Sequence, residues 1–235
     1  MITVLSRHRS AIVFSTLTVM SIIVGLACIF IGSVDIPFDE VVNSLIGKGT
    51  QKPTWDYIIH ESRIPLTITA ALAGAALAIS GLLMQTTFQN PLAGPSILGV
   101  STGASMGVAI LTLGAGGLLQ GIFGNHIGEY VTNIVGALLG AGIIIAILIG
   151  FSSVIRNTLM LLIIGILISY LSSSTISLLN FFSSAEEVKS YVVWGLGSYS
   201  GVTTQQLPLF ALSTIIALLW SLTLSKPLNA LLLGE

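Results

Sequence analysis

The sequence is short of charge and nearly without cysteine. Of its 235 residues only 7% are Asp, Glu, Lys or Arg, whereas 54% are hydrophobic and the mean hydropathy is +1.00. A soluble domain carries about 25% charged residues, so this composition excludes an ordinary soluble domain and indicates a membrane protein. The net charge of −1 offers no basic face to nucleic acid. The single cysteine, Cys28, excludes an internal disulfide.

Uncharged stretches divide the sequence into candidate membrane spans. Asp, Glu, Lys and Arg are absent between Arg63 and Glu129, and again over 157–185 and 190–225. Such stretches suit the lipid hydrocarbon, where a charge is costly and a helix needs about 20 apolar residues to cross. The sequence therefore predicts an all-α polytopic membrane protein. Its six predicted transmembrane helices are 12–31, 64–84, 96–113, 130–151, 159–179 and 207–224.

The first apolar run has an alternative interpretation as a signal peptide, because Arg7 and Arg9 precede it and Cys28 follows a Gly-Leu-Ala triplet. A signal core is roughly 7 to 15 residues long, whereas this run extends over 12–31. Gly25 also stands where a lipoprotein cleavage site has a large aliphatic residue. We therefore interpret the run as the first span.

Lys and Arg are divided equally between the two predicted sides of the membrane. One side carries Arg7, Arg9, Arg156 and Lys226, and the other carries Lys48, Lys52, Arg63 and Lys189. The first set lies in short segments next to the spans. Lys and Arg concentrate in such segments on the cytoplasmic side of a membrane. The second set includes a longer segment that is also rich in Asp and Glu. Both termini of the chain are therefore predicted to be cytoplasmic.

Two short helices are predicted outside the spans, at the membrane interface. In 35–47, Pro37 stands near a helix start, acidic residues occupy the first turn and Gly47 marks the end. In 184–198, Ser184 and Glu187 have the spacing of a capping box, and glycines end the apolar run. Tyr and Trp in the second segment are typical of the interface.

Two overlapping G-x-S-x-G matches, 99–103 and 103–107, suggest a serine hydrolase with Ser101 or Ser105 as the nucleophile. That motif requires a strand-to-helix elbow and a histidine partner, and the sequence predicts neither here. Glycines that repeat every four residues instead line one face of a helix. Close helix packing is the favoured interpretation.

No cofactor or metal site is predicted. Gly47-Lys48 lacks the upstream glycine of a phosphate-binding loop, and no span has His, Cys, Asp or Glu at metal-ligand spacing. The spans also lack an ionisable residue, which an ion-coupled transporter usually needs to bind its coupling ion. A secondary transporter or channel remains an alternative, but the spans show no residue that would bind its coupling ion. If the chain moves a solute, the energy enters from outside it.

Prolines and glycines interrupt the chain between the second and third spans. Asn90-Pro91 and Gly94-Pro95 forbid a continuous helix. The sequence predicts a tight, uncharged cytoplasmic connection, after which Pro95 and Ser96 begin the third span.

These residues resemble the FecCD/cobalamin-type permease family of ABC importers, which take up iron–siderophore complexes, haem and cobalamin. The resembling motifs are RIP at 63–65, AGAALAISGLLMQ at 73–85, QNPLAGPSILGVSTGAS at 89–105, WGLGSYSG at 194–201 and KPLNALLLGE at 226–235. Within them, the family-motif residues are Gln85, Asn90, Pro91, Leu92, Ala93, Pro95, Gly99 and Gly103.

The resemblance implies a ten-helix type II permease of the bacterial cytoplasmic (inner) membrane, in contact with membrane lipid. It works as a homodimer with two cytoplasmic ATP-binding subunits and a periplasmic or extracellular substrate-binding protein, and ATP is hydrolysed by the partner subunit. Residues 1–235 would form a single transmembrane permease domain that is incomplete at its C-terminal end. Which of the three chelates is carried stays open.

The resemblance also implies roles for individual residues. Arg63 would dock the binding protein together with Glu186 and Glu187, while Leu66 stands where many members have a second arginine. An alternative for Arg63 is a snorkelling anchor of the second span. Ser152 and Ser153 would belong to a cytoplasmic gate. The residues expected to couple to the ATPase are Pro227, Leu228, Asn229, Leu233, Gly234 and Glu235.

Overall fold

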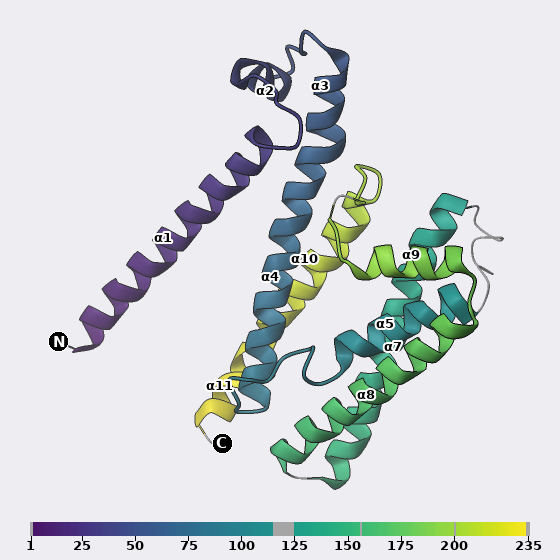
Figure 1. The fold of residues 1–235 in the computed structure, drawn as a ribbon. Coiled ribbons are helices and arrows are strands. Elements are labelled where there is room, and N and C mark those ends of the chain that lie inside the picture. Colours follow the sequence, from purple (N-terminus) through teal and green to yellow (C-terminus); the bar gives the residue numbers. More distant parts are fainter. Residues whose placement is uncertain (1, 115–124, 156, 200, 234–235) are drawn as a thin grey trace. The chain divides into compact units, whose positions relative to one another are not determined.

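The computed structural model describes residues 2–114, 125–155, 157–199 and 201–233, and the regular structure within these ranges is helical (Figure 1). The chain divides into two compact units. The first unit comprises Met1–Ala76 and Tyr199–Trp220, and the second comprises Leu77–Ser198 and Ser221–Glu235. Two helices, α4 (Ile64–Thr87) and α10 (Leu207–Thr223), run across the boundary between the units.

Apolar helices occur at all six predicted span positions. Four helices of the described chain are long and apolar enough to cross a membrane on their own: Arg9–Phe30, Pro53–Thr87, Tyr130–Val154 and Thr158–Phe182. A fifth candidate is a pair bent by 44°, which joins α10 to α11 (Ser225–Leu233). The sixth position holds the shorter apolar helix Val100–Gly114. The predicted class, an all-α polytopic membrane protein, is confirmed.

Three helix boundaries differ from those of the predicted spans. The third span begins at Val100 and not at Ser96, because Gly99 adopts a left-handed conformation with φ of 79°. The second span belongs to a longer helix, in which α3 (Pro53–Ile58) continues through a π turn, η1 (Ile59–Arg63), into α4. The fourth span, predicted to end at residue 151, lies in α7 (Asn125–Val154), which continues past that point and includes Ser152 and Ser153.

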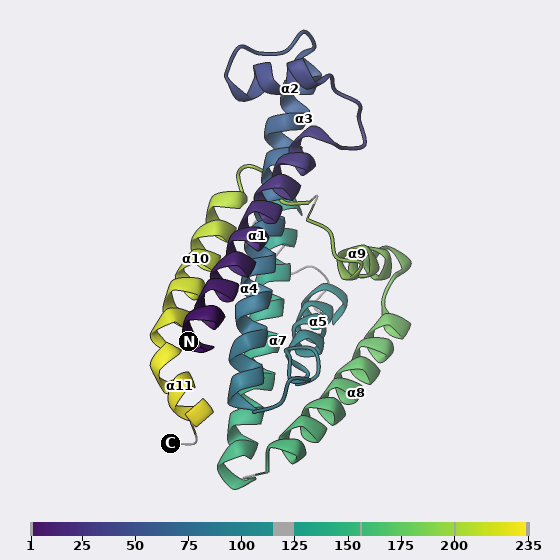
Figure 2. The same cartoon turned by 90° about the vertical axis from the view of Figure 1, so that its left-hand side faces the viewer.

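In the first unit, a small cap is built at the end of α1 (Ile2–Phe30). We define the cap as residues 31–63; it contains the predicted helix α2 (Phe38–Leu45), which lies beside α3 (Figures 1 and 2). Ile36, Val41 and Ile59 form its buried core. The ring of Phe30 stacks on that of Phe38 with centroids 4.6 Å apart. Ile29 and Phe30 also pack against the cap core, so the end of α1 and the cap share an apolar contact.

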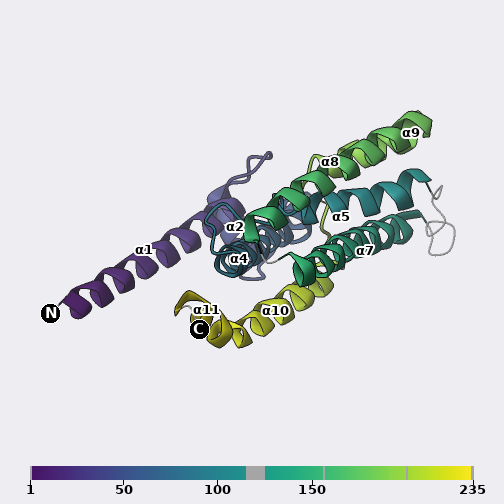
Figure 3. The same ribbon diagram turned by 90° about the horizontal axis from the view of Figure 1, so that it is seen from below.

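In the second unit, α5 (Val100–Ala109) lies between α7 and α8 (Thr158–Phe182) (Figure 3). A π turn, η2 (Ile110–Gly114), extends α5. The side chain of Asn157 caps the start of α8 by accepting hydrogen bonds from the N–H groups of Leu159 and Met160. Apolar packing among these helices forms the core, whose buried residues are Ala93, Leu98, Ile144, Leu148 and Leu162.

The second predicted interfacial helix is α9 (Ala185–Gly195), and its capping box is confirmed. Ser184 accepts a hydrogen bond from the N–H of Glu187, and the Glu187 side chain accepts from the N–H of Ser184. The Tyr191 hydroxyl donates to the carbonyl oxygen of Ser105 at 3.5 Å, so α9 lies against α5 within the second unit.

Candidate functional site

Glycines bring the backbones of α5 and α7 into direct contact. A Cβ placed on Gly103 would lie 3.0 Å from the Gly140 carbonyl oxygen, and it would also overlap the Ile144 side chain. A Cβ on Gly107 would overlap the Gly136 carbonyl oxygen. Glycine leaves room for helix backbones to approach, as small residues do in membrane helix pairs. The predicted packing role of these glycines is confirmed.

Gly99 makes a different contact from the one its spacing predicts. It precedes α5, and a Cβ there would lie 2.8 Å from the carbonyl oxygen of Gly165 on α8. Its φ of 79° is also one that glycine adopts without strain. The glycines of the repeat therefore contact two different helices. Gly99 lies against α8, and Gly103 and Gly107 lie against α7.

The connection between α4 and α5 (88–99) is a series of hydrogen-bonded turns. The Asn90 N–H donates to the Gln85 carbonyl oxygen at 3.1 Å, and the Asn90 side chain accepts from the N–H of Leu92 at 2.9 Å. The carbonyl oxygen of Pro95 accepts from the N–H of Val100 at 3.0 Å. The connection is thus an ordered element that sits on the second unit.

Two apolar side chains fix this connection to the helices behind it. Ala93 and Leu98 are each 2% exposed and belong to the core that includes Leu148 of α7 and Leu162 of α8. Pro91 and Leu92 lie on the exposed side of the same turns. Some family-motif residues, such as Ala93, are therefore buried and anchor the connection to the helices. Others, such as Pro91 and Leu92, lie on its exposed surface.

Gln89 has no role predicted from the sequence beyond its place in the motif 89–105. Its φ is 46°, a left-handed value that is uncommon outside glycine, and its side-chain amide donates to the carbonyl oxygen of Leu231 at 3.2 Å. This bond joins the connection to α11 inside the second unit. The strained backbone and the partner far along the chain leave no local signal in the sequence.

The residues expected to couple to an ATPase lie on α11. Pro227 and Asn229 are exposed, Leu228 is half-buried and Leu233 is 77% exposed. Gly234 and Glu235 lie outside the described residues. The break of 44° after α10 turns α11 away from the line of the span, so the helix presents exposed leucines where a continuous span would have ended.

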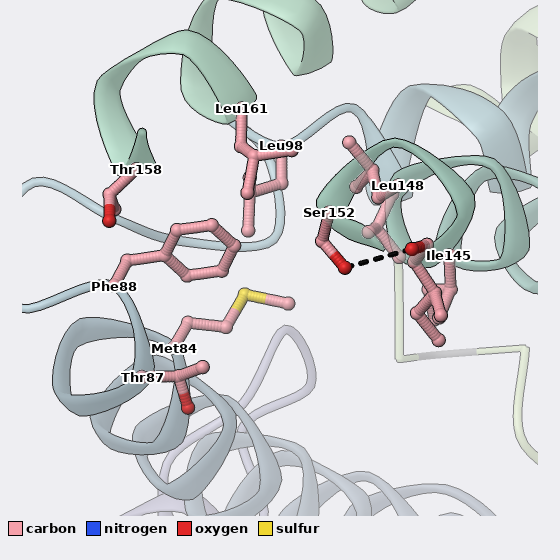
Figure 4. A pocket seen from close by; sticks show the side chains of 11 residues that line it. Met84, Thr87, Phe88, Leu98, Ile145, Leu148, Ser152, Thr158 and Leu161 are labelled. Carbon is pink, nitrogen blue, oxygen red and sulfur yellow. Dashed lines mark hydrogen bonds between the residues drawn. The ribbon is translucent and has the colours of Figure 1, made fainter. Parts of the chain in front are cut away.

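Ser152 and Ser153, the serines expected to belong to a cytoplasmic gate, lie in the last turn of α7. Their hydroxyls donate to the carbonyl oxygens of Ile149 at 2.8 Å and Gly150 at 2.7 Å, so both bonds stay within the helix. Ser152 borders a mostly apolar cavity of about 320 Å³, into which Met84 and Phe88 project from the end of α4 (Figure 4). The cavity lies at the ends of α4 and α7 and at the start of α8.

Arg63, the residue expected to dock a binding protein, is only 6% exposed. Its guanidinium donates to the carbonyl oxygens of Ile29, Phe30 and Val34 in the first unit. A docking role for Arg63 would require these bonds to break. The burial depends on a contact between segments about thirty residues apart, which no local motif indicates.

The two glutamates expected at the docking surface lie in the first turn of α9. Glu186 is exposed. Glu187 accepts from the backbone N–H and the hydroxyl of Ser184, and these bonds hold the pKa of the Glu187 carboxyl below its usual value. Glu187 therefore stays charged as part of the cap, while Glu186 leaves its charge available to a partner.

The serine hydrolase hypothesis is wrong in its geometry. Ser101 and Ser105 both lie inside helix α5, and the Ser105 hydroxyl donates to the carbonyl oxygen of Ser101 at 3.2 Å. A nucleophile elbow needs a strand-to-helix turn at the serine. Over the described ranges, no group of three or more His, Cys, Asp or Glu is arranged to hold a metal ion.

The fold and these sites define a polytopic helical membrane protein in which close-packed helices support the ordered connection 88–99, and in which α11 bends by 44° from α10. The sequence model of the FecCD transport family matches residues 17–235, and the chain belongs to this family.

Similar proteins agree with this membership. The chain is 36% identical over 184 residues to the vitamin B12 import system permease protein BtuC of Escherichia coli O1:K1 / APEC and of Shigella boydii serotype 18, covering 78% of this chain and 53% of each relative. A solved structure in an inward-facing conformation, an ABC transporter provisionally assigned to the metal-chelate type, matches with a TM-score of 0.71 and 27% identity. That match covers 93% of this chain and 64% of the solved chain. The chain spans about half the length of the curated relatives it matches.

Proposed function

We propose that the chain forms part of the permease subunit of an ATP-driven, binding-protein-dependent importer of iron–siderophore, haem or cobalamin. The family membership and the resemblance to vitamin B12 permeases support this function. The observation that carries it is α11, which breaks from α10 by 44° and presents an exposed Leu233. A short exposed apolar helix at the end of a span suits a contact with a cytoplasmic partner.

The proposal includes the surroundings of the chain. Two copies of the permease line the pathway in the bacterial cytoplasmic membrane, two ATP-binding subunits contact α11, and a substrate-binding protein docks on the opposite side, where the exposed Glu186 lies. Both termini of this chain are cytoplasmic in this arrangement. The connection 88–99 and the gate serines then lie on the ATPase side, because each adjoins the end of a span that points there.

A coupling route follows from contacts within the second unit. Movement of α11 reaches the connection through the hydrogen bond between Gln89 and Leu231. The connection is packed through Leu98 against Leu148 of α7, one turn before the gate serine Ser152. ATP-driven displacement of α11 would therefore shift the end of α7, where the gate is proposed.

Energy from a partner ATPase agrees with the chemistry of the spans. Asp, Glu, Lys, Arg and His are absent from α4, α8 and α10. They are also absent from α7 after Glu129. Ion-coupled transporters usually bind their coupling ion at such a group. The alternative, a secondary transporter or channel, therefore lacks the residue that its mechanism would use.

The test uses the full-length protein reconstituted in proteoliposomes with the ATPase encoded beside it. ATP hydrolysis should rise when a binding protein loaded with cobalamin, haem or an iron–siderophore is added, and uptake should require ATP. Uptake without the ATPase would contradict the importer and support the secondary transporter. Failure to assemble with the ATPase would also overturn the proposal.

A further inference from the structure

The guanidinium of Arg63 occupies a cradle at the end of α1. It donates to the carbonyl oxygens of Ile29 at 2.9 Å and Phe30 at 3.0 Å, and to that of Val34 in the segment that follows. The last carbonyl groups of a helix have no partner within the helix, and a cation there also complements the helix dipole. Arg63 thus caps α1 from another helix.

A π turn aims Arg63 at α1. In η1 the N–H of Ile64 donates to the carbonyl oxygen of Ile59, five residues earlier. Pro65 follows, and a proline ring clashes with the carbonyl four residues before it while offering no N–H. A π turn relieves this clash by adding one residue to the turn, and one residue rotates the helix face by about 100°. The sequence Arg63-Ile64-Pro65 therefore fixes the direction of its own arginine.

Gly32 provides the space for the guanidinium. A Cβ at this position would lie 2.9 Å from both Nε and Nη2 of Arg63, and 3.0 Å from Cζ. These distances are shorter than a real side chain tolerates, and the guanidinium cannot yield because its N–H groups are bonded to carbonyls. The glycine and the arginine are matched to each other.

The contacts that hold α1 gather at its end. The most apolar window of its span, within Arg9–Phe30, has none of its residues buried against the described chain. At the end of the helix, Ile29 and Phe30 pack against the buried core of the cap. Two of the Arg63 hydrogen bonds, to the carbonyl oxygens of Ile29 and Phe30, add polar contacts at the same place. Arg63 is therefore part of the contact that fixes the end of α1.

We propose that Arg63 and Gly32 form a latch that fixes the end of α1 and the cap to the start of α4. In this role Arg63 is a positioning residue whose guanidinium is hydrogen-bonded to backbone carbonyl oxygens of its own unit. The inference stands apart from the proposed transport function, because the latch is a property of the first unit alone.

The test is the mobility of a spin label on Cys28, two residues before the end of α1, in the full-length protein in lipid nanodiscs with any other thiol replaced. Arg63→Gln should at least double the mobile fraction of the label. Gly32→Ala, which leaves every charge in place, should have the same effect. Gly81→Ala is the matched control, since a Cβ on Gly81 of α4 meets nothing within 4 Å, and it should leave the spectrum unchanged.

Arg63→Lys separates the latch from a docking charge. Lysine keeps the charge but lacks the planar fork that reaches several carbonyls at once, so the latch predicts a mobile label and a docking charge predicts a wild-type spectrum. The double variant Gly32→Ala/Arg63→Gln should be no more mobile than Arg63→Gln alone, because both changes break the same contact.

An immobile label in Gly32→Ala or in Arg63→Lys would overturn the latch. If Arg63→Gln does not accumulate in the membrane, these two variants carry the test with the same overturning result. If all three variants fail to accumulate while Gly81→Ala accumulates, the result would support the latch. The three share only the altered contact between Arg63 and Gly32, and a glycine-to-alanine change elsewhere is tolerated.

Discussion

Gly107 and Gly136 meet backbone to backbone where α5 crosses α7. A Cβ on Gly136 would lie 2.9 Å from the Gly107 carbonyl oxygen and 3.0 Å from the carbonyl carbon. Gly103 and Gly140 repeat the contact one turn along, so two glycine pairs set the separation of the helices.

Adding a methyl group at the crossing should destabilise the second unit. We expect Gly136→Ala to cost about 1–3 kcal/mol, the usual penalty for overpacking, because the neighbour is backbone and cannot move aside. Thermal unfolding of the purified protein in detergent measures the effect. Gly142→Ala on the same helix is the control, since a Cβ there meets nothing within 4 Å. A similar melting temperature for both variants would contradict the crossing.

Shortening an exposed leucine on α11 should weaken the proposed contact with an ATP-binding subunit. Burial of a leucine side chain is worth about 1.5–3 kcal/mol, so Leu233→Ala should lower the affinity for the ATP-binding subunit by roughly tenfold or more. Leu219→Ala is the control, because Leu219 is 60% exposed on α10, inside the span. Equal binding by both variants, measured by titration in nanodiscs, would argue against α11 as the contact.

The start of α9 should become less stable in acid. Hydrogen bonds from Ser184 lower the pKa of Glu187 below its ordinary value of 4.5. A carboxyl with a depressed pKa stabilises the fold above its ordinary pKa, and the stabilisation is lost as the pH falls through the folded value.

Hydrogen exchange of the 184–195 peptide measures this effect. Wild type should be more protected than Glu187→Gln near neutral pH, and the two should converge in acid. A constant difference across the pH range would mean that Glu187 acts without its charge. Ser184→Ala should remove protection at every pH, because a lost N-cap costs about 1 kcal/mol.

Replacing the serines of α5 should spare transport. Both Ser101 and Ser105 lie in a helix without a nucleophile elbow, so the double variant Ser101→Ala/Ser105→Ala should retain uptake to within about twofold. Loss of uptake, together with labelling of the wild type by a serine-reactive probe, would restore the enzyme hypothesis. Uptake by reconstituted proteoliposomes is the measurement.

Elements with a local signal were predicted correctly from the sequence. The capping box of α9 needs only Ser184 and Glu187 at their spacing, and α2 needs only Pro37 and its acidic first turn. The start of the third span was predicted at Ser96 because Pro95 is a typical helix start. Tertiary packing overrides this local preference, because Leu98 is buried between α7 and α8 before α5 begins.

Contacts between distant segments escaped prediction. The partners of Arg63 lie near residue 30 and the partner of Gln89 is Leu231, so neither bond is visible in any window of the sequence. The roles expected from the resemblance for Glu186, Ser152, Pro227 and the other site residues remain predictions. Their positions are now known for the described residues, and the variants above test the most accessible of them.

The glycine crossing also limits how α5 can move along α7. The contacting glycines are four residues apart on both helices, and four residues of α-helix span about 6 Å. A smaller slide would bring a side chain against the opposing backbone at each crossing point. Even a step of this length would keep a single glycine pair, because Ile144 or Thr132 would then face the other glycine. The crossing therefore opposes axial sliding, and rearrangement of the unit has to occur by tilting or by rotation about the crossing.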